Sequence, residues 1–291
     1  MKCNPIYSNH STNDYPDQKL EKHVLILLSR ETVDNINKRL SFAEHGIYIF
    51  IQYEEKAYII NGFSEDVFWS MVNGLYKLIH DCGNGMINNL LQEVPNDGFK
   101  SLSPFNVTER DMAQKLSGAK EFIIDIENMR TVNYHNMKPS STIDQASIKK
   151  AEKRFQDILQ NSKKPQTNAE WEGCISWVYR NCKILYKLIN ERLDFLETGA
   201  TDKQQAYFCE KYYKCLNDYF QGNMYNIIKE ALKKRRRDNI NKLFIQSLVN
   251  KYKDKVSEKA VELVKCSDKR ADPYFAAIQA ADTIVLKEMR T

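Results

Sequence analysis

The sequence lacks a long apolar stretch. In 291 residues no window reaches the roughly 18 uncharged apolar residues that mark a membrane span. The longest apolar run near the start, residues 24–28, is too short for a signal-peptide core, and residues 1–21 are polar. Gly-rich phosphate loops, nucleophile elbows, kinase motif sets and HExxH zinc motifs are also missing. We therefore expect a cytoplasmic protein without a membrane span or a cofactor, and we lean against an enzyme.

Cysteine is present but lacks the spacing of a metal site or a disulfide framework. The seven cysteines are odd in number, and none belongs to a Cys-x-x-Cys pair. All five histidines lie in the first half of the chain, away from most cysteines, whereas zinc needs close pairs of ligands. We interpret the cysteines as free, partly buried thiols in a reducing compartment.

The composition indicates a packed globular chain with two parts of opposite charge. Apolar residues make up 42% and charged residues 28%, and 13 Phe and 16 Tyr argue against disorder. Residues 1–135 carry 13 basic and 18 acidic side chains, whereas residues 136–291 carry 30 and 20. The second part could face an acidic partner or the first part of the same chain.

Residues 20–135 predict a small mixed α+β domain behind a flexible leader at 1–19. Alternation of Ile with other residues at 47–53, followed by the run at 56–60, predicts a β-hairpin. Residues 121–126 predict another strand, and residues 24–28 fit either a strand or the start of a helix. Ser64 predicts an N-cap for a helix that stops before Gly83. A capping box at Thr108 predicts a helix that stops near Gly118.

Residues 142–291 predict an all-helical domain, either a bundle or an irregular solenoid of helical repeats. Capping boxes begin at Thr167 and Thr201, and Asp272 followed by Pro273 predicts the start of a last helix. Apolar positions recur at helical spacing between these signals, and Gly-marked links are short. The fold class we expect is thus α+β, mostly α.

Carboxylates suggest one catalytic alternative. On a strand, Asp125 and Glu127 would project from the same face, where two carboxylates could hold Mg²⁺. Residues 277–282 are similar to the helical Asp motif of some ribonuclease H-like families, in which that Asp, here Asp282, completes the metal site. The resemblance covers fewer than ten residues, and the strand-borne Asp that those families place near the start is missing. In the simpler interpretation, which we favour, Asp125 ends a strand and Asp282 faces solvent.

A second catalytic alternative is a thiolate enzyme at His80-Asp81-Cys82. A histidine that points at a cysteine can activate the thiol as a nucleophile. Sequence neighbours at a helix end seldom point at each other, and no oxyanion-hole motif accompanies them. We therefore favour a helix terminus here.

The strongest functional signal is a basic cluster near aromatic residues. Its expected members are Lys229, Lys233, Lys234, Arg235, Arg236 and Arg237, with Tyr213 on the preceding Tyr-rich helix. Such a cluster suits an acidic protein surface, nucleic acid or an acidic membrane surface. In the simpler interpretation, which we favour for the cluster by itself, these residues are a solvated helix end, because five consecutive helical residues spread around the whole circumference.

We expect a non-catalytic regulatory protein that binds an acidic protein through its basic helical half. Tyr and Arg dominate the binding energy of protein interfaces, which favours this hypothesis. The Asn-, Lys- and Ile-rich composition is similar to that of proteins that intracellular bacteria deliver into host cells, so an effector or effector regulator is included. The alternative is a nucleic-acid-binding protein, such as a Mg²⁺-dependent nuclease that uses Asp125, Glu127 and Asp282.

Overall fold

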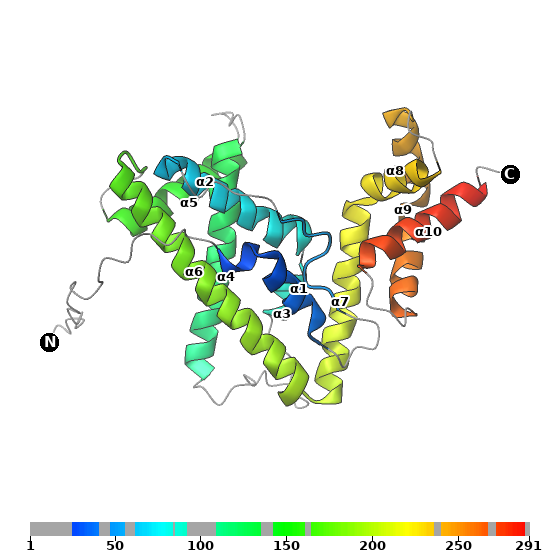
Figure 1. The fold of residues 1–291 in the computed structure, drawn as a ribbon, viewed down its shortest axis with the longest axis horizontal. Helices are drawn as coiled ribbons and strands as arrows, with labels where there is room; N and C mark the ends of the chain where they lie inside the picture. Colours follow the sequence, from blue (N-terminus) through cyan, green and yellow to red (C-terminus); the bar gives the residue numbers. More distant parts are fainter. Residues whose placement is uncertain are drawn as a thin grey trace.

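The chain forms helices throughout the part that the structure describes. This computed structural model describes residues 25–40, 47–55, 62–83, 85–91, 109–134, 142–160, 164–235, 240–266 and 272–288. Every regular element in these ranges is a helix (Figure 1). The α+β class is therefore wrong, because the expected mixed N-terminal unit has no strand among its described residues. In the same ranges, no helix has both the length and the apolar character that crossing a membrane requires.

The helices form two groups, on the left and right of Figure 1. The first group comprises η1 (Ile26–Leu28), α1 (Arg30–Lys38), α2 (Ser64–Tyr76), η2 (Lys77–Cys82), α3 (Met86–Leu90), α4 (Glu109–Tyr134), α5 (Thr142–Leu159) and α6 (Asn168–Asp194). The second comprises α7 (Asp202–Gly222), α8 (Met224–Lys234), α9 (Lys242–Lys265) and α10 (Pro273–Glu288). The π-helical turn η3 (Phe195–Gly199) directly continues α6 and precedes α7. Helices α6 and α7 meet through η3, and α3 packs against both. The domain boundaries at 20–135 and 142–291 stay a prediction.

Local capping signals placed several helix starts correctly. The capping boxes at Thr167 and Thr201 are confirmed as the starts of α6 and α7. Asp272 caps α10, where its Oδ1 accepts a hydrogen bond from the Tyr274 amide at 2.9 Å. Helix α2 begins at Ser64, but Phe63 holds the N-cap position and no side chain caps the helix. These signals succeeded because a cap needs only residues within one turn.

The strand predicted at residues 47–53 is wrong. This segment has no regular structure, yet Ile47, Ile49, Phe50, Ile51 and Tyr53 are all buried. A segment that is buried on most sides needs the same apolar, β-branched residues as a strand. The sequence pattern alone therefore does not distinguish a buried coil from a strand. The second half of the expected hairpin, residues 56–60, lies outside the described residues.

Side chains and a backbone carbonyl of η2, rather than a neighbouring strand, satisfy the backbone of residues 47–53. Oδ1 of Asn37 on α1 accepts from the amides of Ile49 and Phe50 at 2.9 and 3.0 Å. Nδ2 of Asn37 donates to the Phe50 carbonyl at 2.8 Å. Three further amides donate hydrogen bonds. The Tyr48 amide donates to the Tyr212 hydroxyl, the Ile51 amide to the Cys82 carbonyl, and the Gln52 amide to the Asp272 carboxylate. The segment therefore connects α1, η2, α7 and α10.

The strand predicted at residues 121–126 is also wrong, because these residues lie inside α4. The apolar run is part of a longer stripe with helical spacing that is buried at Leu116, Ala119, Phe122, Ile123, Ile126 and Met129. The helix continues through Gly118, where a stop was expected. Thr108, the expected cap, lies outside the described residues. A longer sequence window would have shown the period of 3.6.

The sequence of residues 24–28 fits either a strand or the start of a helix. The described part forms the 3-10 turn η1, and the separate helix α1 follows it after Ser29. Just beyond α1, Arg39 reaches η3: its Nη2 lies 2.5 Å from Glu197 Oε2, and the Leu40 amide donates to the same carboxylate. The C-terminal end of α1 is therefore held at the corner between α6 and η3.

We predict that Asn37→Ala destabilises the fold by about 3 kcal/mol, because it leaves two buried amides and one buried carbonyl without partners. Urea unfolding followed by circular dichroism measures this change. Asn226→Ala is the matched control, since Asn226 is also helical but exposed. It should not lower the free energy of unfolding. Equal stability of the two variants would contradict the role of Asn37.

Candidate functional site

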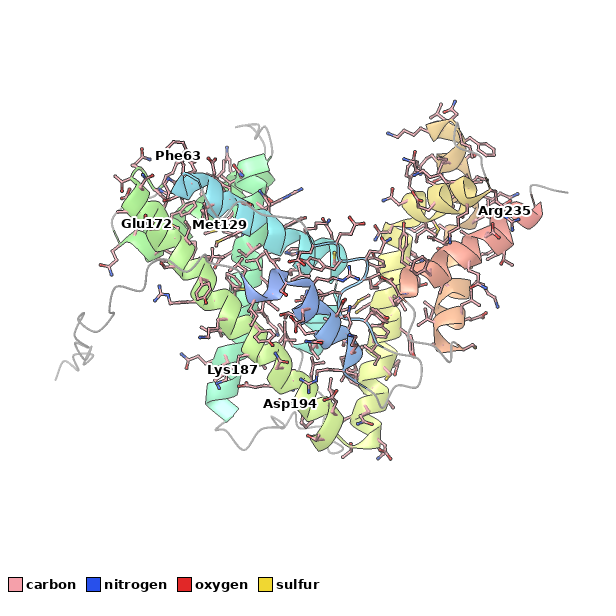
Figure 2. The ribbon with its side chains drawn as sticks, in the orientation of Figure 1. Phe63, Met129, Glu172, Lys187, Asp194 and Arg235 are labelled. Atoms are coloured by element: carbon pink, nitrogen blue, oxygen red, sulfur yellow. The ribbon has the colours of Figure 1, made fainter. Side chains whose placement is uncertain are left out.

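The basic cluster lies on the exposed side and at the end of α8. The opposite face of α8 is buried through Met224, Ile227, Ile228, Ala231 and Leu232. Lys229, Lys233, Lys234 and Arg235 are exposed, and Figure 2 labels Arg235 at this end. Cations are favoured in the last turn by the helix dipole. Arg236 and Arg237 lie outside the described residues.

Two cations of the cluster are engaged with carboxylates. Arg235 makes a two-pronged contact with Asp282 of α10, with Nε–Oδ1 at 2.9 Å and Nη2–Oδ2 at 2.7 Å. Lys233 lies 2.8 Å from Glu230 on its own helix. The Arg235–Asp282 pair fixes the end of α8 against α10, so Arg235 has a structural role in addition to its charge.

Phe275, an exposed aromatic residue that was not predicted as part of the site, lies beside the cations of α8. Phe275 of α10 is 61% exposed, and the Lys234 ammonium lies 5.6 Å from its ring centre. The buried apolar stripe of α10 includes Tyr274 and Ile278. Phe275 lies about 100° around the helix from Tyr274 and is therefore outside that stripe. A helical projection of α10 would have found it. We call Lys229, Lys233, Lys234, Arg235 and Phe275 the α8–α10 surface.

Tyr213 has a different neighbour from the one expected. It is half-buried on α7, and its ring lies 4.8 Å from the Lys265 ammonium of α9. It contacts Tyr212, whose ring centre is 5.5 Å away. The contacts that place Tyr213 are therefore with α9 and with its own helix, and we leave it out of the α8–α10 surface.

The carboxylates of the nuclease alternative do not come together. Asp125 and Glu127 lie on α4, about 200° apart around the helix, with Asp125 buried and Glu127 exposed. Asp282 lies on α10 in the other group of helices (Figure 1). Arg154 of α5 lies 2.6 Å from Asp125, and Arg235 pairs with Asp282. Each of these two aspartates is thus neutralised by an arginine.

The similarity to ribonuclease H-like families does not extend to the fold. Those families have a five-stranded sheet that carries one of their metal-binding Asp residues, and the described ranges contain no strand. In these ranges, no group of three or more His, Cys, Asp or Glu side chains is placed to hold a metal ion.

Cys82 and His80 lie on the π-helical turn η2 and face different surroundings. Burial raises the pKa of the Cys82 thiol to about 12, so the thiol stays protonated at neutral pH. The His80 ring stacks on Tyr76 at 4.6 Å, and burial lowers the pKa of His80. A protonated, buried thiol is a poor nucleophile. The prediction of free thiols is confirmed for Cys82, Cys174, Cys182, Cys209, Cys215 and Cys266.

Comparisons with protein-family models, with curated proteins and with solved structures each gave no match.

We predict that the Asp125 carboxyl makes stability depend on pH. Burial raises the pKa of Asp125 to about 6, against the attraction of Arg154; an exposed Asp has a pKa of about 3.9. Between these values the unfolded chain releases the proton and the folded chain keeps it, so the free energy of unfolding falls as pH rises. Relative to the Asp125→Asn variant, the free energy of unfolding of the wild type should fall by about 1 kcal/mol between pH 4 and 7, after allowance for solvent screening.

Urea unfolding of both proteins across this pH range measures the difference. If the difference stays constant or changes in the opposite direction, Arg154 keeps the Asp125 carboxyl ionised at acid pH.

Proposed function

We propose that the protein is a non-catalytic binding protein that holds an acidic protein partner on the α8–α10 surface. The observation that carries the proposal is the exposed Phe275 ring beside the Lys234 ammonium, among the other cations of α8. Protein interfaces obtain most of their binding energy from a few aromatic and cationic side chains surrounded by polar ones.

The charge distribution supports an acidic partner. The second part of the chain, residues 136–291, carries 30 basic and 20 acidic side chains. Lys229 and Lys233 are four residues apart and therefore share one face of α8. Such a surface attracts an acidic patch and increases the rate of encounter with it.

The local contacts favour a protein over nucleic acid. Guanidinium groups are the best donors to phosphate, but the guanidinium group of Arg235 already donates two hydrogen bonds to the Asp282 carboxylate. The hypothesis that the protein regulates another delivered protein or a host-cell protein stays a prediction from composition.

We predict that the triple variant Lys229→Ala, Lys234→Ala, Phe275→Ala weakens binding of the partner by about 30-fold, which corresponds to about 2 kcal/mol. The measurement is capture by the tagged protein from nuclease-treated lysate, followed by titration of the captured protein. The control variant Lys149→Ala, Lys150→Ala, Phe63→Ala removes the same charge and one exposed ring from the first group of helices. It should bind like the wild type.

Loss of all captured protein after nuclease treatment would overturn the proposal in favour of nucleic acid. In that case the affinity for labelled RNA or DNA should fall linearly on a log–log plot against salt, and the triple variant should flatten that slope. Equal weakening by the two triple variants would show that only net charge matters.

A further inference from the structure

A groove lies between the first half of α4 and the second half of α6. The two helices contact each other where Phe122 meets Trp177, with ring centres 5.3 Å apart. From there they separate toward the start of α4 and the end of α6 (Figure 1). One cavity is lined by both helices, and a second follows α6 next to it; Ile184 of α6, which is 51% exposed, lines both.

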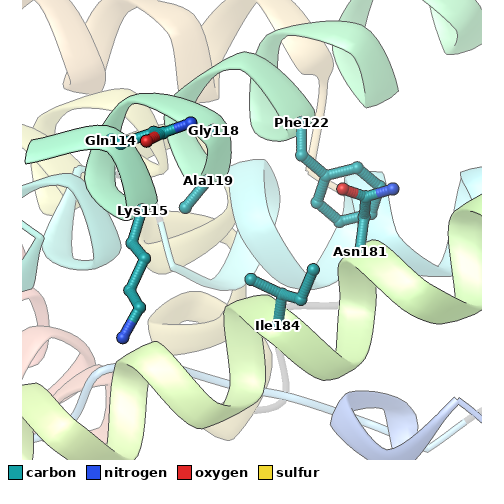
Figure 3. Close-up of a pocket in the computed structure, with 7 residues that line it drawn as sticks. All are labelled: Gln114, Lys115, Gly118, Ala119, Phe122, Asn181 and Ile184. Atoms are coloured by element: carbon teal, nitrogen blue, oxygen red, sulfur yellow. The ribbon is translucent and has the colours of Figure 1, made fainter. Parts of the chain in front are cut away.

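The inner cavity has a volume of about 360 Å³ and a mostly apolar floor. Figure 3 shows its lining residues: Gln114, Lys115, Gly118, Ala119, Phe122, Asn181 and Ile184. A Cβ atom added at Gly118 would have no atom within 4 Å, so this position of α4 faces open space. A glycine inside a helix costs up to about 1 kcal/mol relative to alanine. Here it leaves room for a second backbone to come close to α4.

The outer cavity has a volume of about 700 Å³ and follows α6. Its described lining residues are Arg180, Lys183, Ile184, Tyr186, Lys187 and Asn190. Helical residues rise about 1.5 Å each, so positions 180 to 190 extend over about 15 Å, or three turns. Figure 2 labels Lys187 on this side of α6.

Cations line both cavities, and the described lining residues include no carboxylate. Lys115 contributes from α4, and Arg180, Lys183 and Lys187 contribute from α6. Glu191 Oε1 lies 3.8 Å from the Lys187 ammonium, and the Lys187 side chain is 76% exposed. A pair at this distance with so exposed a lysine offsets little of the positive charge.

We propose that this α4–α6 groove binds an acidic amphipathic α-helix of a partner protein. Phe122 and Ala119 are buried and close the floor of the inner cavity. The exposed Ile184 matches the apolar face of such a helix, and the lysines and Arg180 match acidic residues on its flanks. A third helix is the natural occupant of a groove between two helices, since its ridges fit the groove that their side chains form. Binding by addition of a β-strand would need a strand edge, and the described ranges contain none.

The groove belongs to the first group of helices, whereas the α8–α10 surface belongs to the second (Figure 1). The inference therefore stands independently of the proposed function. A variant of one surface should leave binding at the other unchanged, so failure of either proposal can be recognised by itself.

The first test is selection of displayed random peptides of about 16 residues, which as a helix span about 24 Å. The full-length protein is the target, and the Ile184→Glu variant serves for counter-selection. We expect enrichment of peptides that carry a net negative charge and apolar residues at helical spacing. Enrichment of basic or proline-rich peptides, or no enrichment, would overturn the proposal.

The second test is the affinity of a selected, synthesised peptide for variants, measured by fluorescence anisotropy. Ile184→Glu adds a negative charge to the floor, and Gly118→Trp fills the open space, so each should weaken binding by about 10-fold or more. Ile124→Glu is the matched control, because Ile124 is an exposed isoleucine of α4 that lines neither cavity. It should bind like the wild type.

Circular dichroism and thermal unfolding of all three variants check that the fold is kept. Equal affinity of the wild type and the Ile184→Glu variant would overturn the proposal. So would self-association that Ile184→Glu abolishes while the selected peptide does not compete, since the occupant would then be a second copy of the chain.

Discussion

The buried, irregular segment at residues 47–53 is the constraint on which the arrangement of helices depends. A buried backbone must find partners for its amides and carbonyls, and this one has no neighbouring strand to supply them. Asn37, Tyr212 and Asp272 supply them instead, from α1, α7 and α10. These helices must therefore stand at fixed positions around the segment, and the two groups of helices are joined through it.

Asp272 shows how this constraint reaches the α8–α10 surface. One of its oxygens caps α10 and the other accepts from the Gln52 amide, so the start of α10 is tied to the buried segment. Helix α10 packs on α8, and the Arg235–Asp282 pair fixes their relative position. The direction in which Phe275 and Lys234 face solvent thus follows from a hydrogen bond to a segment far away in the sequence.

The charged residues divide into those that hold the fold and those that line surfaces. Arg39, Arg154 and Arg235 each pair with a carboxylate on another element, and Arg192, which is 1% exposed, donates to the Leu90 carbonyl at 2.9 Å. Lysines supply most of the charge at the α4–α6 groove and the α8–α10 surface. Arginine suits the structural contacts because its planar fork makes several directed hydrogen bonds, whereas lysine keeps its charge hydrated.

The sequence by itself determined the helices α6, α7 and α10, because a capping box and a 3.6-residue apolar stripe depend on residues within one or two turns. It also located the basic cluster on α8. The helix through residues 121–126 also follows from the sequence, once a window long enough to show its apolar period is used. Only the tertiary structure decided that residues 47–53 are a buried coil. It alone showed that Arg154 and Arg235 neutralise Asp125 and Asp282, and that a groove opens between α4 and α6. These features depend on partners from 12 to 220 residues away, and local periodicity contains no information about which distant side chain satisfies a buried polar group.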